Sequence, residues 1–183
     1  LYDNTESPKI SKPTPAANYK AYIKSNTIDN SSFNQDRDLT EIQFSNTNGI
    51  AEIKARTFDG CTNLNNININ VEDSVDGNAS FPNTLRTIKG NAFRNIGRDD
   101  SLSGTDFNIK LNDGLINIFK SAFQGSGITS ITIPSTVTLL GASTITADSN
   151  VFKDCERLID VVFETGSQIT ILGKQTFIDC ESL

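Results

Sequence analysis

The segment Ile53-Lys-Ala-Arg-Thr-Phe58-Asp-Gly-Cys61-Thr-Asn-Leu64-Asn-Asn-Ile67-Asn-Ile69 carries the pattern that decides the fold. Its central phenylalanine has five counterparts along the chain, at Phe33, Phe93, Phe123, Phe152 and Phe177. The six positions are separated by 25, 35, 30, 29 and 25 residues, and their apolar neighbours recur with them. A period of this length predicts a repeat protein, in which each unit stacks on the next.

Each unit has two parts. Leu64, Ile67 and Ile69 stand six, nine and eleven residues after Phe58, and this alternating end predicts a short strand with one buried face. The part around the phenylalanine, I-x-x-x-A-F-x-x-C-x-x-L, has apolar residues three to six apart, which predicts a helical turn or short helix. A unit of about 25 residues cannot bury its apolar side alone, so we expect successive strands to form a parallel sheet with a spacing of about 4.8 Å.

These strings, together with Ile131-Thr-Ile133-Pro134-Ser-Thr-Val137-Thr-Leu-Leu140-Gly141, resemble the BspA-like leucine-rich repeats of bacterial and protist surface antigens. The pattern of that family is close to I-G-x-x-A-F-x-x-C-x-x-L-x-x-I-x-I-P-x-x-V-x-x-I. The resemblance implies an α/β solenoid of about six coils, with a parallel sheet on the concave face and short helical turns on the convex face. Three insertions depart from the pattern, near residues 71–80, 97–105 and 141–151.

The repeats are predicted to cover residues 27–183, with the C-terminal unit truncated. Residues 1–26 lack the pattern and are predicted to be a linker and a possible capping helix. In that helix Thr14 would be the N-cap and Pro15 the first helical residue, so that Tyr19, Tyr22 and Ile23 would cover the open end of the stack. Because Met is missing at position 1 and the chain stops within a unit, we expect a processed protein or a fragment.

The composition argues against several functions. The chain has no histidine, which excludes Ser-His-Asp and Cys-His catalytic arrangements within it. A net charge of −6 and 16 scattered Lys and Arg residues argue against nucleic-acid binding. The sequence contains no stretch of 18 apolar residues, so it predicts no transmembrane segment. We therefore expect a protein that is not an enzyme and that has no cofactor or metal.

Acidic residues cluster in three polar segments. The clusters are Asp36/Asp38/Glu41, Glu72/Asp73/Asp76 and Asp99/Asp100/Asp106. We expect them to be solvated surface groups, and a calcium site in a loop is the alternative, since calcium prefers clustered oxygen ligands.

The cysteines Cys61, Cys155 and Cys180 all stand three residues after a repeat phenylalanine. We expect free thiols packed inside the coils, as small apolar side chains. Cys155 and Cys180 fall in adjacent units, so their expected separation of about 5 Å also permits a disulfide, although parallel side-chain directions argue against it.

The outward positions of the predicted strands are the candidate binding residues. They are Gln43, Asn66, Asn68, Asn108, Lys110, Ser130, Thr132, Asp160 and Val162. Such a face is either a solvated sheet surface or a platform for a protein or glycan, as solenoids commonly offer. Because aromatic and arginine anchors are scarce there, a binding role would rest on weak or multivalent contacts.

The family resemblance implies an extracellular or cell-surface location and an adhesin-like role. The expected function is a non-enzymatic interaction module that binds proteins or glycans of a host or a neighbouring cell. The alternative is a structural spacer in a larger surface protein whose binding or catalytic part lies elsewhere. The oligomeric state is not predicted.

Overall fold

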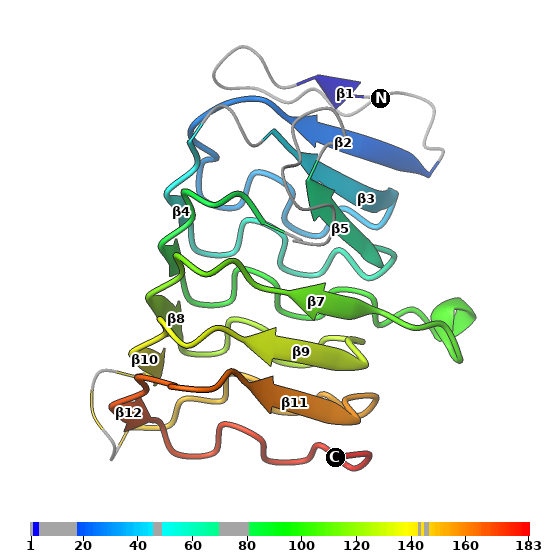
Figure 1. The fold of residues 1–183 in the computed structure, drawn as a ribbon. Helices are drawn as coiled ribbons and strands as arrows, with labels where there is room; N and C mark the ends of the chain where they lie inside the picture. Colours follow the sequence, from blue (N-terminus) through cyan, green and yellow to red (C-terminus); the bar gives the residue numbers. More distant parts are fainter. Residues whose placement is uncertain (1, 4–17, 46–48, 70–80, 143, 145–146) are drawn as a thin grey trace.

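The computed structural model shows a chain that winds into coils stacked along one axis (Figure 1). It describes residues 2–3, 18–45, 49–69, 81–142, 144 and 147–183. Strands occupy two sides of the stack, and a run of turns that contains the repeat phenylalanines forms the third side. The predicted array of stacked parallel strands is therefore confirmed.

The first side of the stack holds the longer strands, in two parallel sheets. One sheet contains β1 (Tyr2–Asp3), β2 (Tyr19–Ile23), β3 (Leu39–Phe44) and β5 (Asn66–Ile69). The other contains β7 (Asn108–Lys110), β9 (Ser130–Ile133) and β11 (Asp160–Phe163). In β9 the buried Ile131 and Ile133 alternate with half-buried Ser130 and Thr132, as the sequence predicted.

The second side carries a narrow parallel sheet that the sequence analysis did not predict. Its strands are β4 (Glu52–Ile53), β6 (Thr87–Ile88), β8 (Asn117–Phe119), β10 (Leu139–Gly141) and β12 (Ile171–Leu172). The repeat residue five positions before the phenylalanine lies in this sheet and points into the core, for example Ile53, Ile88 and Ile118. This residue was assigned to a helical turn, and it belongs to a strand instead.

The helical turns expected around the phenylalanines are not confirmed. Each phenylalanine segment is a series of turns. Among the described residues, the helical segment is the 3-10 helix η2 (Asp100–Leu102), and it lies in the second insertion. The residues two before and two after each phenylalanine have positive φ: Ser31 and Gln35, Arg56 and Gly60, Asn91 and Asn95, Ser121 and Gly125, Asn150 and Asp154, Gln175 and Asp179. A right-handed helix needs consecutive residues at negative φ, so these pairs interrupt it twice in every unit.

Backbone hydrogen bonds on the turn side run between coils. The N–H groups of Phe58, Phe93 and Phe123 donate to carbonyls of the following coil, with N to O distances of 2.8, 2.8 and 2.9 Å. The residue two positions later does the same, as in Gly60 N–H to Arg94 carbonyl at 2.8 Å and Gly125 N–H to Lys153 carbonyl at 2.7 Å. We call this set of bonds the turn ladder. It replaces the bonds that a helix would make within one unit.

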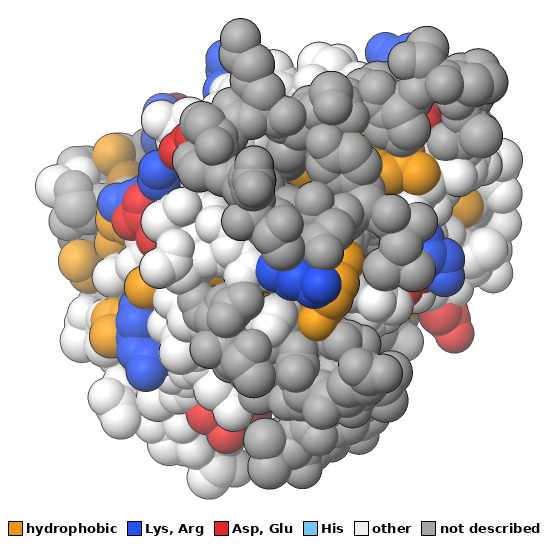
Figure 2. Space-filling view, turned by 90° about the horizontal axis from the view of Figure 1, so that it is seen from above, with side chains coloured by type: hydrophobic (Ala, Val, Ile, Leu, Met, Phe, Trp, Pro, Cys, Tyr) orange, Lys and Arg blue, Asp and Glu red, His pale blue; other side chains and the backbone are white. Residues whose placement is uncertain are grey.

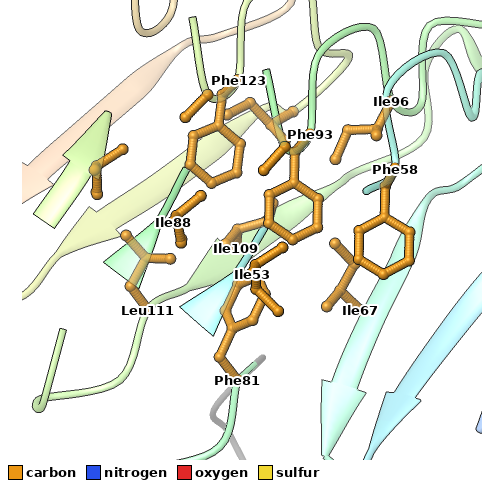
Figure 3. Close-up of a cluster of buried hydrophobic side chains, with 14 of the residues drawn as sticks. Ile53, Phe58, Ile67, Phe81, Ile88, Phe93, Ile96, Ile109, Leu111 and Phe123 are labelled. Carbon is orange, nitrogen blue, oxygen red and sulfur yellow. The ribbon is translucent and has the colours of Figure 1, made fainter. Parts of the chain in front are cut away.

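The core is a column of stacked phenylalanine rings bordered by aliphatic side chains (Figure 3). Ring centroids of neighbouring coils lie 5.2–5.5 Å apart, from Phe33 through Phe58, Phe93, Phe123 and Phe152 to Phe177. Phe81, which follows the first insertion, packs against Phe44 at 5.7 Å and Phe93 at 5.5 Å between ring centroids, so it adds apolar volume next to the column. Aromatic burial in one continuous column is what joins the coils into a single core.

The predicted capping helix is wrong where the structure describes it. Tyr19–Ile23 form strand β2, which pairs in parallel with β1 and β3. Ala21 and Ile23 point inward, whereas Lys20 and Tyr22 point outward, so the segment has the alternation of a strand. Pairing along β3 gives these residues backbone partners that a helix of so few residues could not match, because short helices are marginal in water. Thr14 and Pro15 lie outside the described residues, and the boundary between residues 26 and 27 stays a prediction.

Candidate binding face

The outward side chains of β2, β3, β5, β7, β9 and β11 make up one side of the molecule, which we call the strand face. Strand register arranges them in two rows. The first row contains Lys20, Glu41 and Asn66 on one sheet and Asn108, Ser130 and Asp160 on the other. The second row contains Tyr22, Gln43 and Asn68, and then Lys110, Thr132 and Val162. The predicted residues therefore share one side of the stack, divided between two sheets.

Glu41 is the centre of a polar network on the N-terminal sheet. Its carboxylate receives an ion pair from Lys20 Nζ at 2.6 Å and hydrogen bonds from Gln43 Nε2 at 2.7 Å and Asn68 Nδ2 at 3.4 Å. Asn68 Nδ2 also donates to Asn66 Oδ1 at 3.1 Å. The predicted residues Gln43, Asn66 and Asn68 thus belong to one connected group.

The protonation of Glu41 reflects two opposing effects. Burial raises the pKa of its carboxyl, but the hydrogen bonds from Lys20, Gln43 and Asn68 and the charge of Lys20 outweigh burial and hold the pKa below its ordinary value. The network is therefore built around a carboxylate. From the sequence, Glu41 was named only as a member of an acidic cluster, and this central role was not predicted.

The C-terminal sheet offers a more open set of groups. Asn108, Lys110, Asp160 and Val162 are exposed, and Ser130 and Thr132 are half-buried. Asn108 Oδ1 accepts hydrogen bonds from Ser130 Oγ at 2.7 Å and Thr129 Oγ1 at 2.9 Å, which fixes the amide of Asn108 at the edge of the face. This sheet presents an ammonium, a carboxylate, an amide and hydroxyls within three adjacent strands.

A model of the BspA type leucine rich repeat region matches residues 26–77 and 74–183, in six copies. The chain belongs to the BspA-type leucine-rich repeat family. No curated protein gives a significant match.

Two crystal structures resemble this BspA-type array. A leucine-rich repeat protein from Bacteroides ovatus ATCC 8483 is 27% identical, with a TM-score of 0.60 over 85% of this chain and 33% of that one. The chain thus spans about a third of the length of that relative. A leucine-rich repeat protein of T. pallidum is 18% identical, with a TM-score of 0.54 over 90% of this chain and 71% of that one, and it shares the fold.

The cysteine position of the BspA-type repeat has a defined partner. The Sγ atoms of Cys61, Cys155 and Cys180 donate to the phenylalanine carbonyl of the preceding coil, at 3.0, 3.1 and 3.0 Å. All three thiols are free, and Cys61 and Cys155 are fully buried. Burial raises the pKa of Cys61 to about 12 and the pKa of Cys155 well above its ordinary value. The predicted buried free thiols are confirmed for these two residues, and Cys180 is half-buried.

A hollow of about 140 Å³ lies where the second insertion meets the BspA-type coils. Its charged lining residues are Arg98, Asp100, Asp154, Glu156 and Arg157. They mainly hold the insertion: the Arg157 guanidinium donates to the Gly97 and Asp99 carbonyls at 3.3 and 3.1 Å, and Arg98 pairs with Glu156 at 3.3 Å.

Clustered acidic side chains are the groups that could form a cation site in this chain. Within the described residues, no three His, Cys, Asp or Glu side chains gather where they could hold a metal ion. The cluster Glu72/Asp73/Asp76 lies outside those residues. In the same part of the chain, no helix is long and apolar enough to cross a bilayer.

Proposed function

We propose that this chain is a non-enzymatic interaction module, extracellular or at a cell surface, that binds proteins or glycans of a host or neighbouring cell through the strand face. The observation that carries the proposal is the arrangement of the outward polar side chains in two rows on parallel sheets. The predicted contact residues are Gln43, Asn66, Asn68, Asn108, Lys110, Ser130, Thr132, Asp160 and Val162. Membership in a family of surface proteins supports the location.

The chemistry of the face supports a polar ligand. Amides, hydroxyls, Lys110 and Asp160 provide both donors and acceptors, which suits sugar hydroxyls or a polar peptide surface. Aromatic anchors are scarce, so each contact is expected to be weak and the binding multivalent. Basic groups are dispersed among acidic and neutral ones in the view of Figure 2, which does not favour a nucleic-acid partner. The absence of histidine supports a role without catalysis or a cofactor.

The test is binding of the purified chain to immobilised fibronectin, fibrinogen and a glycan panel. We expect saturable binding to at least one of them, weakened at least tenfold by the double substitution Asn108→Ala and Lys110→Ala. Lys153→Ala is the matched control, because Lys153 lies on the turn side and should leave binding unchanged. Absence of saturable binding to every surface would overturn the proposal.

A structural spacer is the second candidate function. It is favoured by the mutual hydrogen bonding of Glu41, Gln43 and Asn68, which occupies polar groups that a ligand would otherwise use. If the chain is a spacer, the double substitution Asn108→Ala and Lys110→Ala would change no binding. It would also leave unchanged the stiffness of the stack, measured by small-angle scattering.

A further inference from the structure

A glycosylation motif lies on the turn side of the first coil. Asn30, Ser31 and Ser32 form the sequence Asn-x-Ser, in which x is not proline, and this is the acceptor motif for N-linked glycosylation. Asn30 is exposed and stands three residues before the repeat phenylalanine Phe33. These three residues belong to none of the described strands, so the motif is not part of the strand face.

The hydroxyl of the motif also has a role in the fold, whereas the asparagine has none that the repeat explains. Ser32 Oγ donates to the Asp29 carbonyl at 2.8 Å. Thr57 and Thr176 occupy the same repeat position, and their hydroxyls likewise donate to the carbonyl three residues earlier, at 2.8 and 2.6 Å. A hydroxyl at this position therefore closes the turn in three coils, but only the first coil combines it with Asn30 two residues earlier.

The surface beside Asn30 has room for a bulky group. The equivalent residues of the next two coils are Ala55 and Gly90, which have small side chains or none. The turn ladder places these coils directly alongside, because Ser31 N–H donates to the Ala55 carbonyl at 3.2 Å and Arg56 N–H to the Gly90 carbonyl at 3.3 Å. A glycan on Asn30 would lie on the turn side and leave the strand face open.

We propose that Asn30 is a site of N-linked glycosylation in a eukaryotic secretory pathway, with a lipid-diphosphate-linked oligosaccharide as the donor. Nδ2 of Asn30 forms a bond to C1 of the first sugar, and the bond from C1 to the diphosphate oxygen breaks. The lipid diphosphate leaves with the electron pair of that bond, and the carboxamide loses one proton to solvent. The proposal rests on the extracellular or cell-surface location given under the proposed function, and not on the binding role.

The transfer is expected to precede closure of the first coil. A transferase must contact the hydroxyl of the motif, and in the folded chain Ser32 is half-buried and its hydroxyl is bonded to the Asp29 carbonyl. Ser31 is held at a φ of 61° by the same turn. The folded chain should therefore be a poor acceptor, whereas an unfolded chain presents the motif freely.

The first experiment secretes the full chain from cultured eukaryotic cells behind a cleavable signal peptide. Asn78→Gln is included throughout, because it removes the other motif, Asn78-Ala79-Ser80. We expect the intact mass to rise by one oligosaccharide, which peptide-N-glycosidase removes. Asn30→Gln should abolish the added mass. Ser32→Thr should retain it, because Thr completes the motif and already occupies this position in two other coils.

The second experiment tests the order of events with a microsomal transferase and its lipid-linked donor. The purified, unglycosylated, folded chain should be modified at least tenfold more slowly than a peptide of residues 26–36, which serves as the unfolded reference. A peptide that is not modified, or a folded chain that reacts as fast as the peptide, would contradict this order.

The site itself is disproved by a secreted chain without a glycan, or by an added mass that persists in Asn30→Gln, with circular dichroism showing that each chain is folded. No binding partner enters these measurements, so their failure is distinct from failure of the proposed binding role.

Discussion

Positive φ at fixed positions is the residue-scale feature that shapes every unit. A left-handed conformation costs an ordinary L-residue about 1–2 kcal/mol, and Gly, Asn and Asp tolerate it best. The chain uses Asn91, Asn95, Asn150, Asp154 and Gly125 at such positions. Arg56 and Gln35 occupy them as well, so packing in the stack outweighs local preference there.

Gly127→Ala should destabilise the fold strongly. A Cβ at this position would lie 1.9 Å from the Gly97 carbonyl oxygen, which is backbone and cannot rotate away. We expect a loss of about 1–3 kcal/mol, as for overpacked cores, measured by urea unfolding. Gly166→Ala is the comparison: no atom lies within 4 Å of its Cβ, and only its φ of +81° opposes the change. Equal losses in both variants would contradict the steric explanation.

Glu41 should make part of the stability depend on pH. Its pKa in the folded protein lies below the ordinary value of 4.5, so the ionised carboxylate stabilises the fold above that pH. This contribution is lost as the pH falls from about 5 through the folded pKa. We expect Glu41→Gln to be less stable at pH 7, with the difference from the native chain shrinking toward pH 3.5 in urea titrations. The exposed Glu181→Gln is the control, and a gap independent of pH would refute the prediction.

At the scale of elements, the column of stacked phenylalanine rings is the main feature that holds the coils together. Each inner ring is covered by the rings of the coils before and after it, so Phe123 is fully buried. The two end rings each have one ring partner, and of these Phe33 is buried, whereas Phe177 is half-buried. The burial of each ring should therefore decide how much it contributes to the free energy of unfolding.

Truncating an inner ring should cost more than truncating the last one. Phe123→Ala is expected to lower the free energy of unfolding by about 3–5 kcal/mol, as for buried phenylalanines generally. Phe177→Ala should cost less than half of this, because less apolar surface is removed from the core. Thermal and urea unfolding of both variants provide the measurement, and similar losses would show that the end coil is as well covered as the inner ones.

The longer strands β3, β5, β7, β9 and β11 were predictable from the sequence, whereas β2, the narrow sheet and the turns were not. Ile131 and Ile133 alternate with polar residues, and this period of two has one structural meaning. The spacing between Ile53 and Phe58 suits a helix and equally suits a strand followed by turns. Hydrogen bonds to neighbouring coils select the second conformation, and these bonds cannot be read from one repeat. The Asn residues two before and two after Phe93 were the local signal for turns.

The candidate face was predictable only in part. Gln43 and Asn68 were found because their strands repeat the family pattern. Lys20 and Tyr22 were missed because β2 lies outside that pattern, although Tyr19-Lys-Ala-Tyr-Ile23 alternates as a strand does. The Glu41 network depends on side chains from three coils, and no single repeat contains the information to predict it.

For the molecule as a whole, most hydrogen bonds of a coil are made with the coils next to it, although the Arg98–Glu156 ion pair joins coils two apart, so an inner coil is expected to be more stable than one with a neighbour on one side. The Phe123 N–H is bonded to the Val151 carbonyl in the interior, whereas no acceptor in the described residues faces the Phe177 N–H. We expect the Phe177 amide to exchange with deuterium at least a hundredfold faster than the Phe123 amide at micromolar protein. Equal protection of the two amides would contradict this gradient.

The direction of the turn ladder has a consequence for synthesis. Every donor belongs to the earlier coil and every acceptor to the later one, as from Phe93 to Ala122. On a ribosome, a completed coil therefore waits for the next 25–35 residues before its turn amides find partners. At about 5–20 residues per second, that delay is roughly one to seven seconds for each coil. At any moment, the last completed coil of the nascent chain therefore has turn N–H groups without backbone acceptors, and this set of N–H groups moves forward with elongation.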